Sequence, residues 1–381
     1  MGMNLRGMAR IGVACLIGTA ATAMVATPTS AATEADYIVV LEAAAGVEAR
    51  AASVADRFDS TVDHTYRHVL SGFSLRLSQD EARKLAGADG IASVTPDSEV
   101  HALGEQVNPP SWGLDRIDQR DLPLDQRYRY PNEAEGITAY VLDTGVRSTH
   151  QDFAGRVLPG YDFTDDDTNA SDENGHGTFI AGIIGGTKYG VAKKIRIVPV
   201  KVLNANGSGT ISDVIAGIDW VAQHATGPAV ANMSLGGSAN QLIDDAVRAA
   251  IAGGVSFTVA AGSSASDAGN FSPARVAEAL TIGASDMRDC ISSSTNRGPL
   301  VDMFAPGVNI TGPWISSDTA SNTMSGSSLS APHVAGAVGI YLYDHPTATA
   351  AEVSAALIAA STKDRLCNVP ANTANRLLYV G

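Results

Sequence analysis

From residue 104 onward the chain alternates short, continuous apolar runs with longer stretches whose apolar residues recur at helical spacing. Runs such as 136–143 and 195–203 are typical of strands that are buried on both faces of a sheet. Stretches such as 210–225 and 330–345 are long enough for helices. Strands that alternate with helices predict a mainly parallel sheet covered on both faces, so we expect an α/β domain here. Further apolar runs lie at 228–235, 255–262, 279–285 and 300–307, and further helical stretches at 176–186, 242–254 and from 347.

A smaller unit precedes this domain. The pattern predicts strands at 36–42, 72–78 and 90–103, with helices at 47–58 and 79–89. This order indicates a compact βαββαβ-like α+β unit. The segment "GEQVNPPS" follows it with the glycine, asparagine and paired prolines of an exposed linker. We therefore predict one domain over residues 33–103 and a second over 104–381.

The first 32 residues have the pattern of a secretory signal peptide. Arg6 and Arg10 precede an apolar stretch at 11–26, and small residues follow as far as Ala32. A membrane anchor is the alternative, but the stretch is shorter than the roughly 20 apolar residues of a spanning helix. We expect residues 1–32 to be removed, which leaves a secreted, extracellular protein with no membrane attachment.

Composition and charge exclude some classes of partner. The chain has 381 residues, of which 45% are hydrophobic, so it can bury a large core. Its formal net charge is −14, and lysine and arginine form no cluster, so nucleic acid would be repelled. We therefore expect no nucleic-acid partner.

The cysteines leave two alternatives open. Cys15 lies in the predicted signal peptide, so Cys290 and Cys367 remain in the exported protein. An oxidising compartment would preserve a bridge between them, and closing so long a loop adds on the order of 4 kcal/mol. Two buried free thiols explain the sequence nearly as well.

Three short motifs carry residues of chemical interest. Asp143 ends an apolar strand in "AYVLDTGV", and His176 lies between two glycines in "ENGHGTFIAG", which leaves its imidazole unobstructed. Ser328 lies in "GSSLSAPHVAGAVGIYL", at the start of a long helix whose free amides and positive dipole end favour a developing anion. Taken singly, the three residues have plainer explanations as a turn cap, a structural histidine and a helix N-cap.

Taken together, in the order Asp, His, Ser, the three motifs point to one family. The segments "VLDTGV", "NGHGT" and "GSSLSAPHVAG" resemble the signatures of the subtilase serine peptidases. The segments "PSWGLDRIDQR", "YGVAKK", "GPAVANMSLGG" and "FAPG" resemble the proteinase K and aqualysin branch. The resemblance covers nearly all of residues 104–381 and implies a three-layer subtilisin-like fold.

Residues 33–103 resemble the inhibitor-type prosegment that precedes such domains, most clearly in "TYRHVLSGFSLRLS". The resemblance implies that this unit acts as an intramolecular chaperone and inhibitor of its own catalytic domain. It also implies a maturation cleavage in the region of 101–108 and a monomeric mature protein.

The implied chemistry is acyl transfer by a catalytic triad. His176 takes the proton of Ser328 as the hydroxyl attacks a peptide carbonyl, and then gives it to the leaving amine. Asp143 fixes the imidazole tautomer and stabilises the imidazolium. No cofactor takes part in these steps.

A protein or peptide substrate would bind as an added strand, through backbone hydrogen bonds to two segments. Small residues at 260–262, beside Leu235, indicate a roomy apolar pocket for the side chain before the cut. The residues implied in substrate binding are Gly207, Ser208 and Gly209 on one segment and Ser234, Leu235 and Gly236 on the other.

Ser263 departs from the family at a position that matters for the chemistry. It stands where subtilases have the asparagine whose amide stabilises the oxyanion. Its side chain is roughly an ångström shorter, and losing the amide costs about 10² to 10³ in kcat, a magnitude whose reference case is itself a subtilase. We therefore predict a slow endopeptidase. The alternative is a subtilase-fold protein that binds peptides but has lost useful turnover.

Other departures are milder. Ser327 replaces a threonine and keeps the hydroxyl, and a tyrosine or tryptophan is usual at Arg297. Leu329 and Ser330 replace methionine and alanine, and Phe179 replaces a second histidine. Several of these positions lie close to the nucleophile in the sequence.

Structural calcium is implied by the same resemblance. The carbonyls of Ala277 and Ala279, with the carboxylate of Asp302, match one family site, and hard oxygen ligands suit this ion. Arg127 stands in a second site at a position where the branch can have an oxygen ligand. The residues that match this second site are Asp115, Asp118, Gln119 and Asp125. The cluster Asp162, Asp165, Asp166 and Asp167 is either a third site or a solvated acidic loop.

Overall fold

A computed structural model describes residues 34–42, 46–97 and 104–381. The chain forms two compact units that divide at residue 100. The predicted signal peptide lies outside the described residues, as do residues 101–103 of the region predicted for maturation cleavage. Within the described ranges, no helix combines the length and the apolar content that a bilayer crossing requires.

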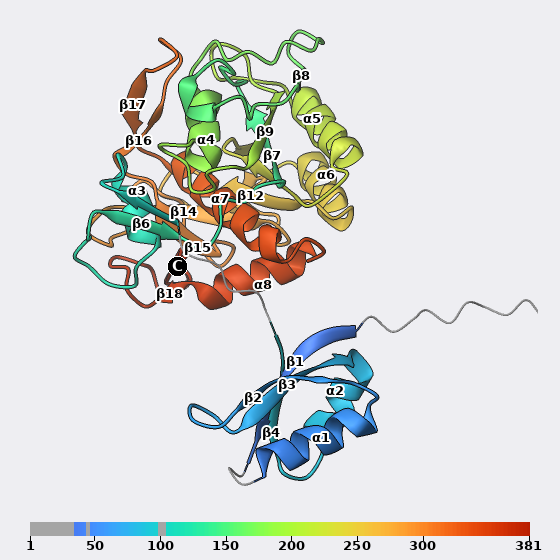
Figure 1. The fold of residues 1–381 in the computed structure, drawn as a ribbon. Helices are drawn as coiled ribbons and strands as arrows, with labels where there is room; N and C mark the ends of the chain where they lie inside the picture. Colours follow the sequence, from blue (N-terminus) through green and yellow to red (C-terminus); the bar gives the residue numbers. More distant parts are fainter. Residues whose placement is uncertain (1–33, 43–45, 98–103) are drawn as a thin grey trace, which may run out of the picture. The chain divides into compact units, whose positions relative to one another are not determined.

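The first unit is a four-stranded antiparallel sheet with two helices (Figure 1). Along β1, Tyr37, Val39 and Leu41 alternate with more exposed residues and pack into a core with both helices. The observed order is βαββαβ, as in the predicted βαββαβ-like unit. The sequence pattern located only three of the four strands, and β2 was missed because most of its side chains are exposed. The elements are β1 (Glu34–Leu41), α1 (Val47–Arg57), β2 (Val62–Tyr66), β3 (Gly72–Ser78), α2 (Gln79–Ala86) and β4 (Ile91–Pro96), and the strand order is β2-β3-β1-β4.

The second unit contains a nine-stranded sheet in the order β18-β19-β15-β14-β12-β10-β7-β9-β8. Its strands are parallel except for the pair β18 and β19. The strands are β7 (Thr138–Asp143), β8 (Tyr161–Asp162), β9 (Arg196–Lys201), β10 (Ala229–Met233), β12 (Ser256–Ala260), β14 (Leu280–Ser285), β15 (Met303–Pro306), β18 (Thr362–Lys363) and β19 (Arg376–Leu377). The predicted parallel α/β sheet is therefore confirmed.

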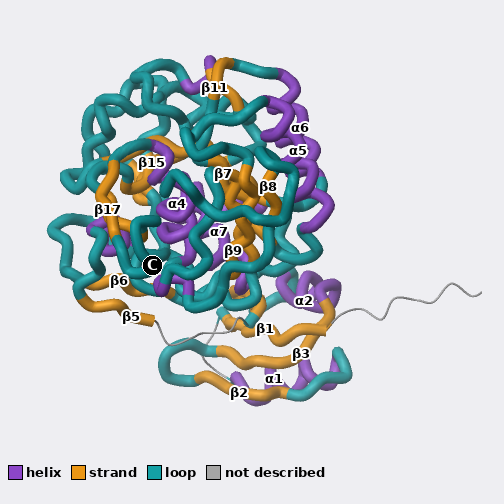
Figure 2. Tube along the Cα trace, turned by 90° about the horizontal axis from the view of Figure 1, so that it is seen from above, coloured by secondary structure: helices purple, strands orange, loops and turns teal. Residues whose placement is uncertain are grey.

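Helices cover both faces of this sheet (Figure 2). Along β7, Ala139 and Val141 pack into a core shared with α4 and α7, whereas Tyr140 and Leu142 pack into a core shared with α5 and α6. This alternation explains why the strand is apolar throughout. The helices are α3 (Trp112–Ile117), α4 (His176–Gly185), α5 (Ile211–His224), α6 (Gln241–Ala252), α7 (Ser327–Asp344) and α8 (Ala350–Ala360).

Three short antiparallel pairs and two 3-10 turns complete this unit. Cys290 and Cys367 form a disulfide, with their Cα atoms 4.4 Å apart, so the structure decides between the two alternatives that the sequence left open. The pairs are β5 (Gly104–Val107) with β6 (Arg127–Tyr130), β11 (Gly237–Ser238) with β13 (Phe271–Ser272), and β16 (Ile310–Pro313) with β17 (Ser321–Met324), and the turns are Gln151–Phe153 and Ala268–Asn270.

Candidate active site

Asp143 and His176 meet where β7 ends and α4 begins. Asp143 is the last residue of β7 and is fully buried, and His176 is the first residue of α4. The Nδ1 atom of His176 lies 2.8 Å from Oδ1 and 3.0 Å from Oδ2 of Asp143. Nδ1 donates to this carboxylate because the carboxylate can only accept, so Nε2 is left as the basic nitrogen.

The Asp143 carboxylate also sets the basicity of His176. Burial lowers the pKa of the imidazole, but the charge of Asp143 and the hydrogen bond to it raise the pKa by more. The net result is a pKa above the ordinary value of 6.5. A proton taken up by His176 is therefore stabilised, as a general base requires.

Ser328 lies in the first turn of α7, and its carbonyl has an unusual partner. Pro332, four residues further on, has no backbone N–H, so it cannot make the helical hydrogen bond to the Ser328 carbonyl. The hydroxyl of Ser234 donates to that carbonyl instead, at 2.6 Å. The proline thus leaves an acceptor that anchors the start of α7 to the segment after β10.

Two further residues extend this anchor into the sheet, and sequence reasoning missed both. The amide of Asn232 donates to the Ser234 hydroxyl at 2.9 Å, and the hydroxyl of Thr258 donates to Asn232 at 3.0 Å. Asn232 and Thr258 are fully buried on β10 and β12. Polar residues inside two apolar strands were the signal that could have found them, because buried polar groups need partners.

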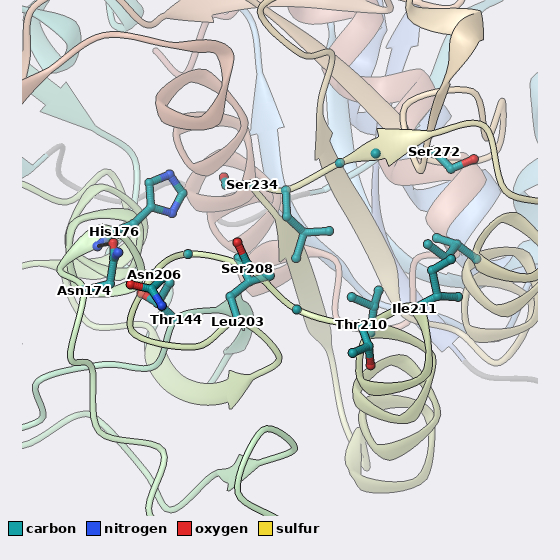
Figure 3. Close-up of a pocket in the computed structure, with 17 residues that line it drawn as sticks. Thr144, Asn174, His176, Leu203, Asn206, Ser208, Thr210, Ile211, Ser234 and Ser272 are labelled. Carbon is teal, nitrogen blue, oxygen red and sulfur yellow. Dashed lines mark hydrogen bonds between the residues drawn. The ribbon is translucent and has the colours of Figure 1, made fainter.

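A hollow of about 590 Å³ lies beside His176 (Figure 3). In Figure 3, His176 lies at one end, Thr210 and Ile211 lie toward the other, and Ser208 lies between them. The structure brings together the two segments predicted to bind substrate. All six of their predicted residues line this hollow, namely Gly207, Ser208, Gly209, Ser234, Leu235 and Gly236.

A second hollow, of about 320 Å³, lies beside Ser328. It shares the segment 234–237 with the first hollow, and the small residues at 260–262 line it together with Leu235, as the sequence predicted. Phe271 and Ala274 add to its apolar wall. A cleft with His176 in one part and Ser328 in the next can bind an extended peptide past both groups.

Asn296 in the wall of the second hollow was not predicted. It is fully buried, its amide donates to the carbonyl of Ala261 at 2.8 Å, and its oxygen accepts from the backbone N–H groups of Ser264 and Ser266 at 2.9 and 3.1 Å. Asn296 therefore holds the loop that carries Ser263. It is the one side-chain amide among the described residues that line this hollow.

Ser263 is exposed, and its side chain lies against the start of α7. Its Oγ accepts from the backbone N–H of Ser327 at 3.4 Å and lies 3.4 Å from the Ser327 hydroxyl. The Ser327 hydroxyl in turn accepts from the backbone N–H of Gly262 at 3.0 Å. The hydroxyl of Ser263 thus lies at the start of the helix that carries Ser328.

Family models match both units of the chain. Residues 134–377 match the model described as the subtilase family. The chain belongs to the subtilase family. Residues 36–103 match the model described as peptidase inhibitor I9, so this subtilase carries an inhibitor-type prosegment, as predicted.

Relatives of this subtilase are named as proteinases. The extracellular serine proteinase of Thermus sp. (strain Rt41A) is 46% identical over 88% of this chain and 81% of its own length. The alkaline serine exoprotease A of Vibrio alginolyticus is 45% identical over 84% of this chain, which spans 60% of that relative. The crystal structure of a cold-adapted subtilisin-like serine proteinase matches with a TM-score of 0.69 and 50% identity, covering 71% of this chain and 98% of that one. The chain is therefore a subtilisin-like serine endopeptidase.

The chemistry of the Asp302 side chain suits a calcium ligand. Asp302 precedes β15, and its Oδ2 accepts from the backbone N–H of Thr281, two residues beyond Ala279. Burial raises the pKa of Asp302 to about 6, and Arg376 only partly offsets this effect. A half-buried carboxylate whose negative charge is only partly offset has the hard-oxygen chemistry that calcium prefers.

The residues of the second predicted calcium site suit the ion less well. One carboxylate oxygen of Asp118 is buried without a hydrogen-bond partner among the described residues, which favours a cation, and burial raises its pKa to about 6. Both oxygens of Asp115, however, accept from backbone N–H groups, and Arg129 is paired with Asp125 at 2.8 Å. The amide of Gln119 donates to the carbonyls of Asp121 and Pro123. Arg129 thus supplies part of the positive charge that this set was expected to take from calcium.

The acidic cluster at 162–167 forms a solvated turn, which is the second of the two alternatives. Asp162 is buried, accepts from the backbone N–H of Thr164 at 2.7 Å and faces Lys201 at 3.9 Å. Asp165, Asp166 and Asp167 are exposed. In the described part of the chain, no three acidic, histidine or cysteine side chains converge as metal ligands.

Phe179, Leu329 and Arg297, three of the other positions predicted to depart from the family, have packing or hydrogen-bond partners in the structure, whereas Ser330 is buried with an unpaired hydroxyl. Phe179 is fully buried and meets Trp314 edge to face, with ring centroids 6.3 Å apart. Leu329 is buried in the main core, and the guanidinium of Arg297 donates to the carbonyl of Ala265 at 2.8 Å. Among the described residues, the buried hydroxyl of Ser330 has no hydrogen-bond partner.

Proposed function

We propose that this subtilase is a secreted endopeptidase that cleaves peptide bonds through Asp143, His176 and Ser328, with weakened oxyanion stabilisation. The observation that carries the proposal is the pair of short distances, 2.8 and 3.0 Å, between His176 Nδ1 and the buried Asp143 carboxylate. Such a carboxylate fixes the tautomer in which Nε2 can accept a proton. Secretion is supported by a relative that is named an extracellular serine proteinase.

The proposed reaction has two halves. Ser328 attacks the carbonyl carbon of the scissile bond while His176 Nε2 accepts the hydroxyl proton, and the same nitrogen then protonates the leaving amine. Water next attacks the acyl-enzyme, His176 accepts its proton, and the Ser328 oxygen leaves with that proton. Asp143 accepts the hydrogen bond from Nδ1 of His176 in both halves and stabilises the imidazolium.

The proposed weakness lies in the stabilisation of the oxyanion. The backbone N–H of Ser328, in the first turn of α7, is free of a helical partner and can donate to the oxyanion. The second donor of the family, a side-chain amide, is replaced by the Ser263 hydroxyl, which lies against Ser327. A donor acts only at about 2.7 to 3.1 Å from the oxyanion, so the shorter side chain gives less stabilisation.

We also propose a structural calcium ion held by Asp302 and the carbonyls of Ala277 and Ala279, with a weaker second site at Asp115, Asp118, Gln119 and Asp125. The half-buried Asp302 carboxylate, whose negative charge is only partly offset, supports the first site. Hard oxygen ligands of this kind stabilise a fold, and the proposed chemistry needs no metal.

A fluorophosphonate probe tests the proposed nucleophile. The probe should form a covalent adduct whose mass maps to Ser328, and Ser328→Ala should remove the adduct. The full chain should release its prosegment, whereas Ser328→Ala should stay uncleaved. An adduct on another residue, or prosegment release by Ser328→Ala in the absence of added protease, would contradict the proposal.

Ser263 also favours the second candidate function, a peptide-binding protein without useful turnover. In that case a peptide would bind in the cleft with an affinity that Ser328→Ala does not change, and it would be recovered intact. Adduct formation with the probe together with peptide turnover would exclude this candidate.

A further inference from the structure

We infer that Asp172 is a positioning residue of the proposed triad. Its side chain connects the loop that follows Asp143 to the first turn of α4, the helix that begins at His176. We call the contact between this loop and this turn the β7–α4 junction. The inference rests on the proposed function. Asp172 is half-buried in the segment between β8 and α4 and is not among the residues that line the cleft. Its role is therefore to hold catalytic groups in place rather than to touch substrate.

The Asp172 carboxylate accepts hydrogen bonds from both segments of the β7–α4 junction. Its Oδ1 accepts from the hydroxyl of Thr144, the residue after Asp143, at 2.8 Å. Its Oδ2 accepts from the backbone N–H and the hydroxyl of Thr178, in the first turn of α4, at 2.8 and 2.6 Å. Oδ1 also accepts from the backbone N–H groups of Asn174 and Gly175, at 2.9 Å each.

The hydroxyls of Thr144 and Thr178 also accept hydrogen bonds, each from the opposite segment of the β7–α4 junction. The Thr144 hydroxyl accepts from the backbone N–H of Gly177 at 2.9 Å, and the Thr178 hydroxyl accepts from the backbone N–H of Arg147 at 2.9 Å. Both threonines are fully buried. His176 lies between these contacts, so they fix the start of its helix relative to the end of β7. Displacements of a fraction of an ångström at such a position lower the rate of catalysis.

The loop after β7 and the first turn of α4 approach each other closely at Gly177. A side-chain carbon at this position would lie 2.1 Å from the carbonyl oxygen of Gly145, on the loop after β7. No larger residue fits without moving one segment. Gly177 therefore permits the close approach of the two segments, and the hydrogen bonds of Asp172 connect them at this place.

Asp172 also acts on His176 electrostatically. The charged groups that raise the pKa of His176 are Asp143, at the end of β7, and Asp172, in the segment before α4. Arg147, on the loop after β7, is paired with Asp318 of the β16–β17 loop at 2.7 Å. Replacing Asp172 by a neutral group should therefore lower the pKa of His176, whereas a change confined to packing would leave it unaltered.

The test compares Asp172→Asn with Glu173→Gln, which removes the same charge from the neighbouring exposed residue. Asp172→Asn should lower kcat by about tenfold while KM changes less than about twofold. The acidic limb of its kcat/KM profile should move to lower pH. Glu173→Gln should leave kcat and the acidic limb as they are. A folded Asp172→Asn protein with the parent kcat and the parent acidic limb would overturn the inference.

Thr178 provides a second pair of variants, because Asp172→Asn removes several hydrogen bonds at once. Thr178→Val should lower kcat with the acidic limb in place, and Thr178→Ser, which keeps the hydroxyl, should restore kcat. Equal kcat values for Thr178→Val, Thr178→Ser and the parent would show that the junction does not need these contacts.

Titration of the His176 imidazole by NMR in the Ser328→Ala background separates this inference from the proposed function. Ser328→Ala removes turnover, so the result does not depend on activity. Asp172→Asn should lower the imidazole pKa in this background and Glu173→Gln should not. An unchanged pKa would overturn the electrostatic part of the inference, whether or not the parent protein turns out to be active.

Discussion

The hydroxyl oxygens of Ser263 and Ser327 lie 3.4 Å apart, at the start of the helix that carries Ser328. Both positions were predicted from the sequence to depart from the family pattern, and their hydroxyl oxygens face each other in the structure. The Ser327 hydroxyl accepts from the backbone N–H of Gly262, so its hydrogen is free to be donated to Ser263. The Ser263 hydrogen can then point into the cleft.

Removing the Ser327 hydroxyl should therefore slow the enzyme. Ser327→Ala leaves the Gly262 N–H without its partner and removes the hydroxyl beside Ser263, although the backbone N–H of residue 327 still faces Ser263, so kcat should fall about tenfold with little change in KM. Ser327→Thr keeps the hydroxyl and should retain the parent kcat. Steady-state kinetics of the three proteins on one peptide measure the effect. Equal losses in Ser327→Ala and Ser327→Thr would mean that packing, and not the hydroxyl, is responsible.

The pH dependence of turnover should report the pairing of His176 with Asp143. His176 must be neutral to accept a proton, and its pKa is raised above 6.5, so activity should be lost as the pH falls through a midpoint above that value. Asp143→Asn should lower kcat by about 10⁴-fold. A kcat/KM profile of the parent protein provides the midpoint. A midpoint below 6.5 would be incompatible with a carboxylate that stabilises the imidazolium.

Calcium should stabilise the protein more at alkaline than at acidic pH. Asp302 has a folded-state pKa of about 6, above its ordinary value of 3.8, so without calcium its contribution to stability is lost as the pH rises through about 6. Calcium binds the ionised carboxylate and offsets this loss. The gain in Tm on adding calcium should therefore be larger at about pH 8 than at about pH 5.

Asp302→Asn is the matched variant for the calcium effect, because it keeps the size of the side chain and removes its charge. Thermal unfolding with calcium and with chelator should then show a much smaller calcium gain. If Asp302→Asn keeps the full gain, the ion binds elsewhere, and Asp118→Asn becomes the variant to compare.

The disulfide should contribute measurably to the stability of the fold. Cys290 and Cys367 are 77 residues apart in the chain, and closing a loop of this length reduces the entropy of the unfolded state. Replacing both by serine should lower the free energy of unfolding by on the order of 4 kcal/mol. Urea unfolding of the two proteins measures the difference. A loss below about 1 kcal/mol would mean that the bridge does little to constrain the unfolded chain.

The hydrophobic pattern predicted the elements that carry the residues of the proposed triad because these elements are buried. β7 is covered by cores on both faces, and α4 and α7 pack against the same sheet, so their sequences are strongly apolar. Asp143 and Ser328 fall at the ends of such elements, where a polar residue interrupts the pattern. The exposed strand Val62–Tyr66 has no such pattern and was missed.

Contacts between distant residues could not be predicted in the same way. The bond from Ser234 to the Ser328 carbonyl joins residues 94 positions apart, and Asn296 holds a loop more than 30 residues away. Neither spacing nor composition reveals which buried polar residue meets which partner. The same limit applied to the cysteines, whose pairing depends on the distance between their Cα atoms.

We propose that Ser263 weakens an otherwise working triad. The most direct measurement is kcat/KM on a peptide with a large apolar residue before the cut, for the parent protein, Ser263→Asn and Ser328→Ala, all matured by an added protease. We predict measurable turnover by the parent, none by Ser328→Ala, and a rise of about 10²-fold in Ser263→Asn. No detectable turnover by any of the three proteins would contradict the proposed peptidase activity and favour a cleft that only binds peptides.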